Sequence, residues 1–122
     1  MQNCHNDLRI KSKLWIEIDG KPLFGQGRMA LLRKIDTHGS INQAAKELDI
    51  SYRKAWSQVK FMEERIGIHL VERHAGGQNG GGATLTTEAR EFIAKFENLI
   101  QGIEEEVDEK FRKIFAGPQE AI

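Results

Sequence analysis

The side chains best suited to recognise another molecule lie close together, where the sequence reads SYRKAWSQVK. An arginine can pair with the edge of a guanine, and a serine hydroxyl can donate or accept a hydrogen bond. Aromatic rings can pack on a sugar or on a thymine methyl group, and the lysines add basic charge to the same polar face. This chemistry favours binding to duplex DNA. The candidate contacts in this stretch are Ser51, Tyr52, Arg53, Lys54, Trp56, Ser57 and Lys60.

Two helices are predicted to position these side chains. Ser40 followed three residues later by Gln43 is a capping box, which marks the start of a helix. Ser51 is a good N-cap for a second helix, predicted over 51–66, and Gly67 can end it. A short helix, a tight turn and a longer polar helix form a helix-turn-helix pattern, in which Ser40 and Gln43 would suit a backbone phosphate. The alternative is a plain helical hairpin with a solvated polar face.

A glycine-rich stretch follows, with five glycines in the seven positions from Gly76 to Gly82. A Walker-type phosphate loop is disfavoured, because Ala83 stands where the lysine is needed and a strand-like pattern follows in place of a helix. Short strands are predicted on both sides of the glycines, so residues 70–86 read as a β-hairpin. A β-hairpin that follows a helix-turn-helix in the sequence is typical of the wing of a winged helix. Its candidate DNA contacts are Arg73, Gly76 and Gly77.

Two further elements are predicted toward the ends of the chain. Residues 14–24 read as a small hairpin around Asp19-Gly20, either covering the core or touching a partner subunit. From Thr87 to Phe115 apolar residues recur at steps of three or four, which predicts one helix of roughly 43 Å. A small winged helix cannot cover that length, so the apolar stripe predicts a homodimer, with another protein as the alternative partner. The predicted dimerisation residues are Phe92, Phe96, Leu99, Ile103, Val107 and Phe111.

Composition limits the class of protein. With 122 residues, 39% hydrophobic and 30% charged, the chain is long enough for one soluble globular domain. Neither a membrane-spanning run nor a signal peptide is found, and the lone Cys4 cannot form an internal disulfide, which favours the cytoplasm and no membrane partner. The net charge of zero hides a balance of +4 over residues 1–87 and −4 over 88–122. The basic part can therefore face phosphates.

Competing chemistry has little support in the sequence. The four histidines and Cys4 show neither C-x-x-C nor H-E-x-x-H spacing, so no metal site is expected. Helix capping accounts for Ser40 and Ser51, and neither Ser51 nor Ser57 has a histidine and carboxylate placed nearby in sequence to activate it. We therefore expect that the protein is not an enzyme.

Three segments together resemble a known family. They are the helix-turn-helix stretch with I-S-Y-R-K-A-W, the glycine-rich G-G-Q-N-G-G-G-A followed by L-T, and the helix that begins T-E-A-R. Over roughly residues 13–115 the chain resembles the N-terminal DNA-binding domain of the molybdate-responsive transcriptional regulators (ModE). The LysR-type regulators share only the looser patterns G-S-[IF]-x-x-A-A-x-x-L and L-T-x-x-[AG], so they rank second.

The pattern and the resemblance predict the same fold class, which is mainly α with a small β part. We expect a disordered N-terminus (1–12), a winged helix-turn-helix DNA-binding domain (13–86), a long dimerisation helix (87–115) and a tail (116–122). The resemblance implies a transcriptional regulator that binds an operator in double-stranded DNA as a homodimer, through the recognition helix 51–66 and the wing 70–86. A protein-interaction winged helix and a LysR-like DNA-binding domain are the alternatives.

The sequence departs from the family pattern at its C-terminus. Full-length family members carry C-terminal oxyanion-binding domains for molybdate or tungstate, and this sequence ends at Ile122. We therefore expect neither oxyanion as a cofactor of this chain, and a separate sensor protein is one candidate partner.

Overall fold

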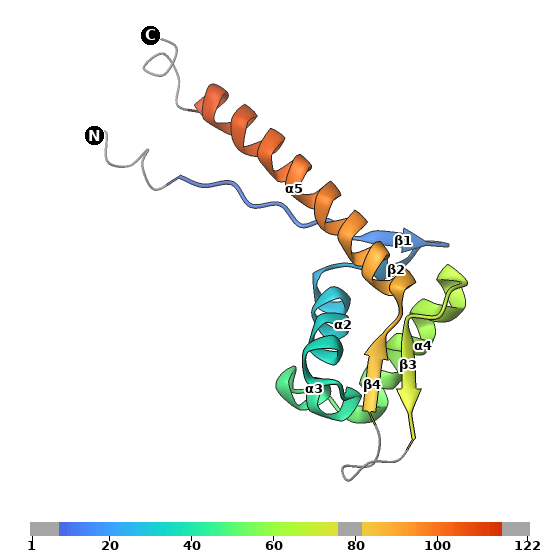
Figure 1. Cartoon of the computed structure of the whole chain (residues 1–122). Coiled ribbons are helices and arrows are strands. Elements are labelled where there is room, and N and C mark those ends of the chain that lie inside the picture. The colour runs from blue at the N-terminus through green and yellow to red at the C-terminus, as the bar shows by residue number, and fades with distance from the viewer. Residues whose placement is uncertain (1–7, 76–81, 116–122) are drawn as a thin grey trace. The chain divides into compact units, whose positions relative to one another are not determined.

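The computed structural model describes residues 8–75 and 82–115, and within them the chain forms four helices and four strands (Figure 1). The order confirms the mainly α fold with a small β part. Residues group into two compact units, Leu14–Ala94 and Met1–Lys13 with Lys95–Ile122. The domain boundaries expected from the sequence stay a prediction. In chain order the elements are β1 (Ile16–Ile18), β2 (Lys21–Phe24), α2 (Gln26–His38), α3 (Ile41–Glu47), α4 (Tyr52–Ile66), β3 (Val71–His74), β4 (Gly82–Leu85) and α5 (Thr87–Phe115).

The hairpin β1–β2 is closed by a two-residue turn. Asp19 and Gly20 have φ angles of 51° and 76°, the left-handed values that a tight hairpin turn needs at both positions. The strands are antiparallel, with Ile18 opposite Lys21. Leu23 and Phe24 of β2 are buried, so the hairpin contributes to the core of its unit. That burial agrees with the core-covering role expected for this hairpin.

The helix-turn-helix is formed by α3 and α4. The turn between them has Asp49 at φ 59°, a left-handed conformation that a short polar side chain tolerates, and the amide of Ile50 donates to the carbonyl of Ala45 at 3.0 Å. Gly67 ends α4 with φ 86°. Helix α3 ends at Glu47 and Leu48 is its C-cap, so Asp49 lies in the turn.

The core of unit Leu14–Ala94 follows the apolar periodicity of the sequence. Small residues at the α3–α4 contact let the two helix backbones approach closely, and each helix buries one apolar face. The buried helical residues are Leu31, Leu32 and Ile35 in α2, Ile41, Ala44 and Ala45 in α3, and Ala55, Val59 and Met62 in α4.

The wing, which we define as β3 and β4, continues directly into α5. Its strands are antiparallel, with Val71 opposite Leu85. Thr86 is buried at the start of α5, where its Oγ1 donates to the carbonyl of His69 at 2.7 Å and accepts from the amide of Ala89 at 3.0 Å. Thr86 is therefore an N-cap that also ties α5 to the segment before β3.

The first two turns of α5 pack within unit Leu14–Ala94. The ring of Phe92 meets the ring of Phe24 edge to face, with centroids 4.9 Å apart and an interplanar angle of 81°. Arg90 donates to Asp36 of α2 at 2.7 Å. These contacts fix where α5 begins.

The part of α5 from Lys95 to Phe115 belongs to the second unit and keeps an apolar stripe. Phe96 and Ile100 are buried, whereas Leu99 is 53% exposed and Ile114 is 71% exposed. The apolar stripe predicted from the sequence included Leu99 and left out Ile100. Steps of three or four residues from Phe96 reach both positions, so the spacing alone does not choose between them. The role of the stripe in dimerisation stays a prediction.

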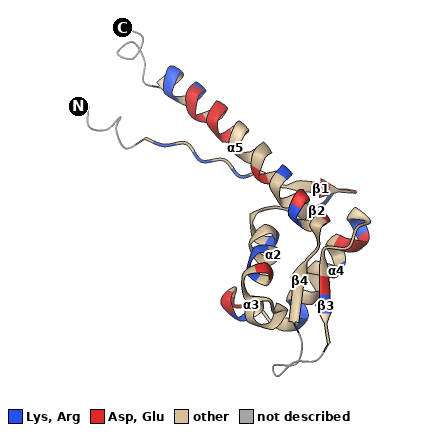
Figure 2. Ribbon diagram, viewed as in Figure 1, with Lys and Arg blue, Asp and Glu red and all other residues tan. Residues whose placement is uncertain are grey.

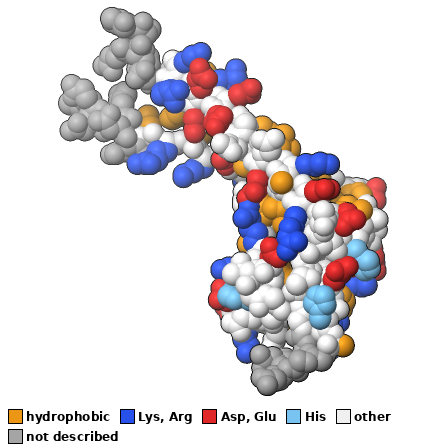
Figure 3. All heavy atoms as spheres, in the orientation of Figure 1, with side chains coloured by type: hydrophobic (Ala, Val, Ile, Leu, Met, Phe, Trp, Pro, Cys, Tyr) orange, Lys and Arg blue, Asp and Glu red, His pale blue; other side chains and the backbone are white. Residues whose placement is uncertain are grey.

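The charges are divided as the sequence indicated. Figure 2 shows the acidic residues of the second unit concentrated on α5, where Glu104, Glu105, Glu106, Asp108 and Glu109 lie close together in sequence. Figure 3 shows hydrophobic side chains exposed between charged groups of both signs. Over residues 8–75 and 82–115, no helix combines the length and apolar character needed to cross a bilayer.

Candidate nucleic-acid interface

A polar groove of about 910 Å³ lies between the helix-turn-helix and the wing. Its walls come from the end of α2 and the loop before α3, from α3, from the first residue of α4, and from the last residues of β3 and the first residues of β4. It collects four of the residues predicted to contact DNA, which are Ser40, Gln43, Tyr52 and Arg73. The other lining residues are His38, Gly39, Ile41, Asn42, Lys46, His74, Gly82 and Ala83.

One wall of this groove depends on a close approach between two backbones. The amide of Ala83 in β4 donates to the carbonyl of Gly39 at 2.9 Å. Gly39 has φ 65°, and a Cβ added at Gly82 would lie 3.0 Å from the Gly39 oxygen. A side chain at position 82 would therefore crowd the junction. The sequence interpretation assigned Gly82 to the loop, whereas the structure places it in β4.

Both helix starts carry the caps that the sequence predicts. Ser40 Oγ accepts from the amide of Gln43, and Ser51 Oγ accepts from the amide of Lys54, each at 3.0 Å. A capping serine uses its oxygen as an acceptor and keeps its own proton available for donation. The amides of the first helical turn otherwise have no partner inside the helix. A phosphate oxygen is the kind of acceptor that suits the groove at the α3 terminus.

An aromatic and cationic cluster joins α4 to the wing. Arg73 Nη2 donates to Tyr52 Oη at 2.8 Å, and the guanidinium carbon lies 4.8 Å from the centre of the Trp56 ring. Lys60 Nζ lies 5.5 Å from the centre of the same ring. We call Tyr52, Trp56, Lys60 and Arg73 the wing cluster. All four were sequence candidates for DNA contact, and the structure brings them together on one surface.

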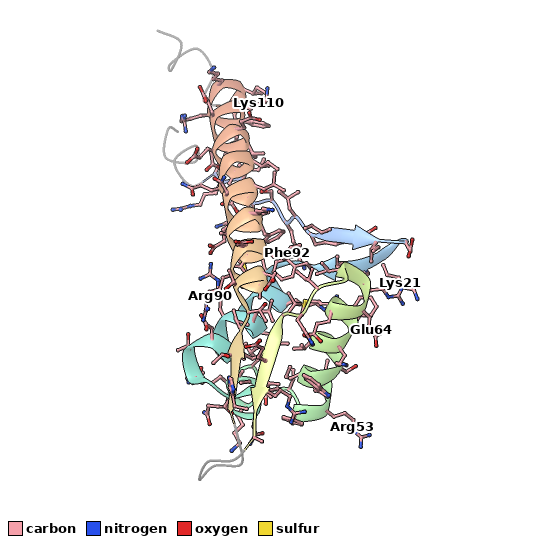
Figure 4. All side chains as sticks on the ribbon, turned by 45° about the vertical axis from the view of Figure 1, so that its right-hand side comes forward. Lys21, Arg53, Glu64, Arg90, Phe92 and Lys110 are labelled. Atoms are coloured by element: carbon pink, nitrogen blue, oxygen red, sulfur yellow. The ribbon has the colours of Figure 1, made fainter. Side chains whose placement is uncertain are left out.

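Three other candidates, Arg53, Lys54 and Ser57, are exposed on α4. Figure 4 shows the Arg53 side chain extending from the N-terminal end of α4 into solvent. A side chain with this orientation can reach the edge of a base when the helix lies in a major groove. Gly76 and Gly77 lie outside the described residues.

The sequence interpretation did not select four polar residues of the groove, which are His38, Asn42, Lys46 and His74. Asn42 and Lys46 are exposed one turn apart on α3, so their spacing was a usable signal. The histidines gave no such signal, because their partners are distant in sequence or on another element. His74 Nε2 lies 3.0 Å from Thr84 Oγ1, and His38 Nε2 lies 3.2 Å from Glu47 Oε2.

Glu63 fixes the base of the wing to α4. Its Oε2 accepts from the amides of Leu70 at 2.8 Å and Val71 at 3.2 Å, and lies 3.3 Å from His69 Nδ1. Burial is the largest single influence and raises the pKa of this carboxyl group, but the two amides and His69 together outweigh it. The net effect is a pKa below the usual value of 4.5, so the carboxylate is charged at neutral pH.

Metal-ligating side chains do not gather in the part of the chain that the structure describes, where no group of three or more His, Cys, Asp or Glu could hold an ion. The groove and its surroundings present basic, hydroxyl and amide groups. Such a set is typical of contacts to phosphates and base edges.

Comparison with known proteins agrees with this geometry. Residues 27–90 match the family described as bacterial regulatory helix-turn-helix protein, lysR family. The chain is 39% identical over 99 residues to the transcriptional regulator ModE of Haemophilus influenzae, covering 81% of this chain and 36% of that protein. It is 31% identical over 117 residues to the molybdenum transport protein ModE of Azotobacter vinelandii, covering 93% and 43%. The chain thus spans less than half the length of these relatives.

Solved structures show the same fold. A crystal structure of a CbnR_DBD–DNA complex matches with a TM-score of 0.52 at 19% identity, over 69% of this chain and 91% of that one. A BenM_DBD/catB site 1 DNA complex matches with a TM-score of 0.51 at 23% identity, over 70% and 90%. These matches confirm the winged helix-turn-helix fold, and the ModE relatives confirm the resemblance seen in the sequence. The chain belongs to the family of bacterial regulatory helix-turn-helix proteins of the lysR type, with ModE regulators among its relatives.

Proposed function

We propose that the protein is a sequence-specific DNA-binding transcriptional regulator of the ModE type. The observation that carries this proposal is the polar groove between α3 and the wing, next to the exposed basic start of α4. The names of the relatives and the DNA complexes formed by two structural neighbours support it. The protein would act in the cytoplasm, where a bacterial operator is found.

The proposed binding mode assigns separate tasks to the two halves of the interface. α4 enters a major groove with its N-terminal end first, and Arg53 reads a base while Ser57 contributes a second polar contact. The polar groove takes the phosphate backbone through Ser40, Gln43 and Arg73. Phosphate contacts set the position of the protein on the duplex, and base contacts set which sequence is preferred.

The proposal includes a homodimer held by the second unit. Phe96 is buried, but Leu99, Ile114 and Phe115 are more than half exposed, and an apolar stripe of this kind needs a cover. A second copy is the simplest cover, and two linked recognition helices bind two half-sites with a gain from avidity. Leu99→Glu should yield monomers in sedimentation and weaken operator binding. Asn98→Glu, which adds the same charge at an exposed neighbouring position of α5, is the matched control. A dimer that survives Leu99→Glu would place the interface elsewhere.

The DNA proposal is tested by fluorescence anisotropy. The probe is a labelled duplex from upstream of the protein's own gene, competed with an unrelated duplex over a series of salt concentrations, with and without molybdate. We expect selective binding whose log affinity falls linearly with log salt, because phosphate contacts release counterions. Molybdate should leave the curve unchanged if this chain acts without a bound oxyanion.

Each other outcome has a distinct meaning. Selective binding that requires molybdate would assign an oxyanion site to this chain. Binding to neither duplex would contradict the proposal and favour a winged helix that binds another protein, in which case the partner would be sought on α5.

A further inference from the structure

In the candidate interface, cations from two different elements lie over the ring of Trp56. Arg73 comes from β3, and Lys60 lies one turn further along α4. The ring itself is half-buried, so part of its surface is covered by protein. A thymine methyl group or a sugar would have to compete with these cations for the ring.

Arg73 has a second contact with α4. Its Nη2 donates to the phenol of Tyr52, one turn before Trp56, while its guanidinium lies near the indole. A guanidinium has five N–H donors in a planar fork, and an aromatic face leaves all of them usable. The phenol takes one. Arg73 is therefore oriented by two side chains of α4 and keeps donors for a phosphate.

We propose that Trp56 is a positioning residue for DNA binding, which holds Arg73 of the wing and Lys60 of the recognition helix at a fixed spacing so that both meet the phosphate backbone. This inference rests on the proposed DNA-binding function. It assigns Trp56 an indirect role, in contrast to the direct contact with a sugar or thymine methyl group that the sequence suggested. It also makes the wing and α4 one binding surface.

The proposal predicts a specific pattern of loss. Without the ring, Arg73 keeps only its hydrogen bond to Tyr52 and Lys60 loses its aromatic contact, so both side chains are less well ordered. Phosphate binding then weakens while base recognition by Arg53 is retained. Trp56→Leu should lower affinity for the operator and for an unrelated duplex by the same factor, roughly tenfold, and should reduce the salt slope by about 1. Trp56→Phe retains an aromatic face and should keep most of the affinity.

The experiment measures both affinities over a salt series for wild type, Trp56→Leu, Arg73→Ala and the double variant. If the indole acts through the guanidinium, Arg73→Ala should cost much less in the Trp56→Leu background than in wild type. Trp15→Leu is the matched control. Trp15 is an exposed indole outside the wing cluster, and it donates to Glu17 of β1. Circular dichroism melting verifies that each variant is folded.

A second readout does not need DNA. In a Trp15→Phe background, Trp56 is the sole tryptophan of the chain, since the sequence contains two. Arg73→Ala should change its emission spectrum in free protein, because the guanidinium near the ring is lost. This measurement also serves if Trp56→Leu does not fold.

The outcomes separate the two proposals. Wild-type protein that binds neither duplex refutes the DNA-binding function and this inference with it. Wild-type binding together with unchanged affinity in Trp56→Leu refutes only the inference. A loss confined to the operator, with the unrelated duplex unaffected, would also overturn it, because Trp56 would then read a base directly. Additive losses in the double variant would show that Trp56 does not act through Arg73.

Discussion

Helix α4 carries two aromatic side chains that each have two cations nearby, and the two sites differ in how those cations are used. In the wing cluster, Trp56 lies near Arg73 and Lys60. Toward the other end of α4, the ring of Phe61 lies 5.0 Å from the guanidinium carbon of Arg28 and 4.9 Å from that of Arg65. We call Phe61, Arg28 and Arg65 the hairpin cluster, because it joins α4 to β1–β2.

In the hairpin cluster the protein itself uses the donors. Arg28 Nη1 donates to the carbonyls of Pro22 at 2.8 Å and Leu23 at 2.9 Å. Burial lowers the pKa of this guanidinium from its ordinary value, and the group stays charged at neutral pH. In the wing cluster Arg73 donates to an exposed phenol beside the groove. The same pairing of arginine with an aromatic ring thus serves folding at one site and, in our proposal, binding at the other.

The largest expected effect tests this contrast directly with matched substitutions. Arg28→Met should lower the free energy of unfolding by about 3 kcal/mol, because two carbonyls lose a charged donor. Arg73→Met should change it by less than about 0.5 kcal/mol, as is usual for an exposed surface site. Urea denaturation of both variants measures the difference. Equal losses of stability would remove the distinction between the two clusters.

A smaller effect separates positioning from readout within the proposed interface. Arg53→Ala should reduce the preference for operator over unrelated duplex by about 2 kcal/mol, the usual value of a bidentate arginine–guanine contact. Lys54→Ala, a neighbouring loss of charge on the same turn, should weaken both duplexes alike. Competition anisotropy gives both ratios. A preference that survives Arg53→Ala would assign the readout to another side chain.

The next effect concerns Glu63, the carboxylate that accepts from two amides at the base of the wing. Because the pKa of Glu63 is depressed in the folded state, its contribution to stability is complete above the ordinary value of 4.5 and is lost as pH falls through the folded pKa. Glu63→Gln should therefore cost about 1 kcal/mol at pH 7, since a charged acceptor becomes neutral. The difference from wild type should shrink below pH 4.5. Chemical denaturation at several pH values would contradict this if the difference grew on acidification.

The smallest effect is expected at the second cation of the hairpin cluster. Arg65 lies 3.9 Å from Asp19, and both side chains are more than a third exposed. Arg65→Met should change the free energy of unfolding by less than about 0.5 kcal/mol, because surface ion pairs contribute little. A loss as large as that of Arg28→Met would mean that the ring contact and not the carbonyl contacts stabilises the cluster.

The sequence predicted the features that depend on neighbouring residues. The caps at Ser40 and Ser51, the turn at Asp19-Gly20 and the end of α4 at Gly67 all follow from side-chain chemistry within a few positions. The start of α5 at Thr87 was also predicted correctly. Local rules are reliable there because the hydrogen bonds that decide the structure are local.

Contacts between distant segments could not be predicted in this way. Tyr52 and Arg73 are 21 positions apart, and no periodicity links them. The junction of β4 with Gly39 gave Gly82 a steric role that a count of glycines could not reveal. Leu99 and Ile100 fitted the apolar spacing of α5 equally well, and only the packed structure shows which of them is buried.

The hydrogen bonds at the base of the wing have a mechanical consequence. Glu63 holds the amides that lead into β3, and Thr86 binds the carbonyl of His69 where β4 has ended. The amide of Thr86 also donates to the carbonyl of Leu70 at 3.0 Å. The other ends of the two strands are also held, because Arg73 donates to Tyr52 and the amide of Ala83 donates to the carbonyl of Gly39. A force on β3 or β4 is therefore passed to the helix-turn-helix and to the start of α5, and is not absorbed by rotation of the strands about a hinge at their base.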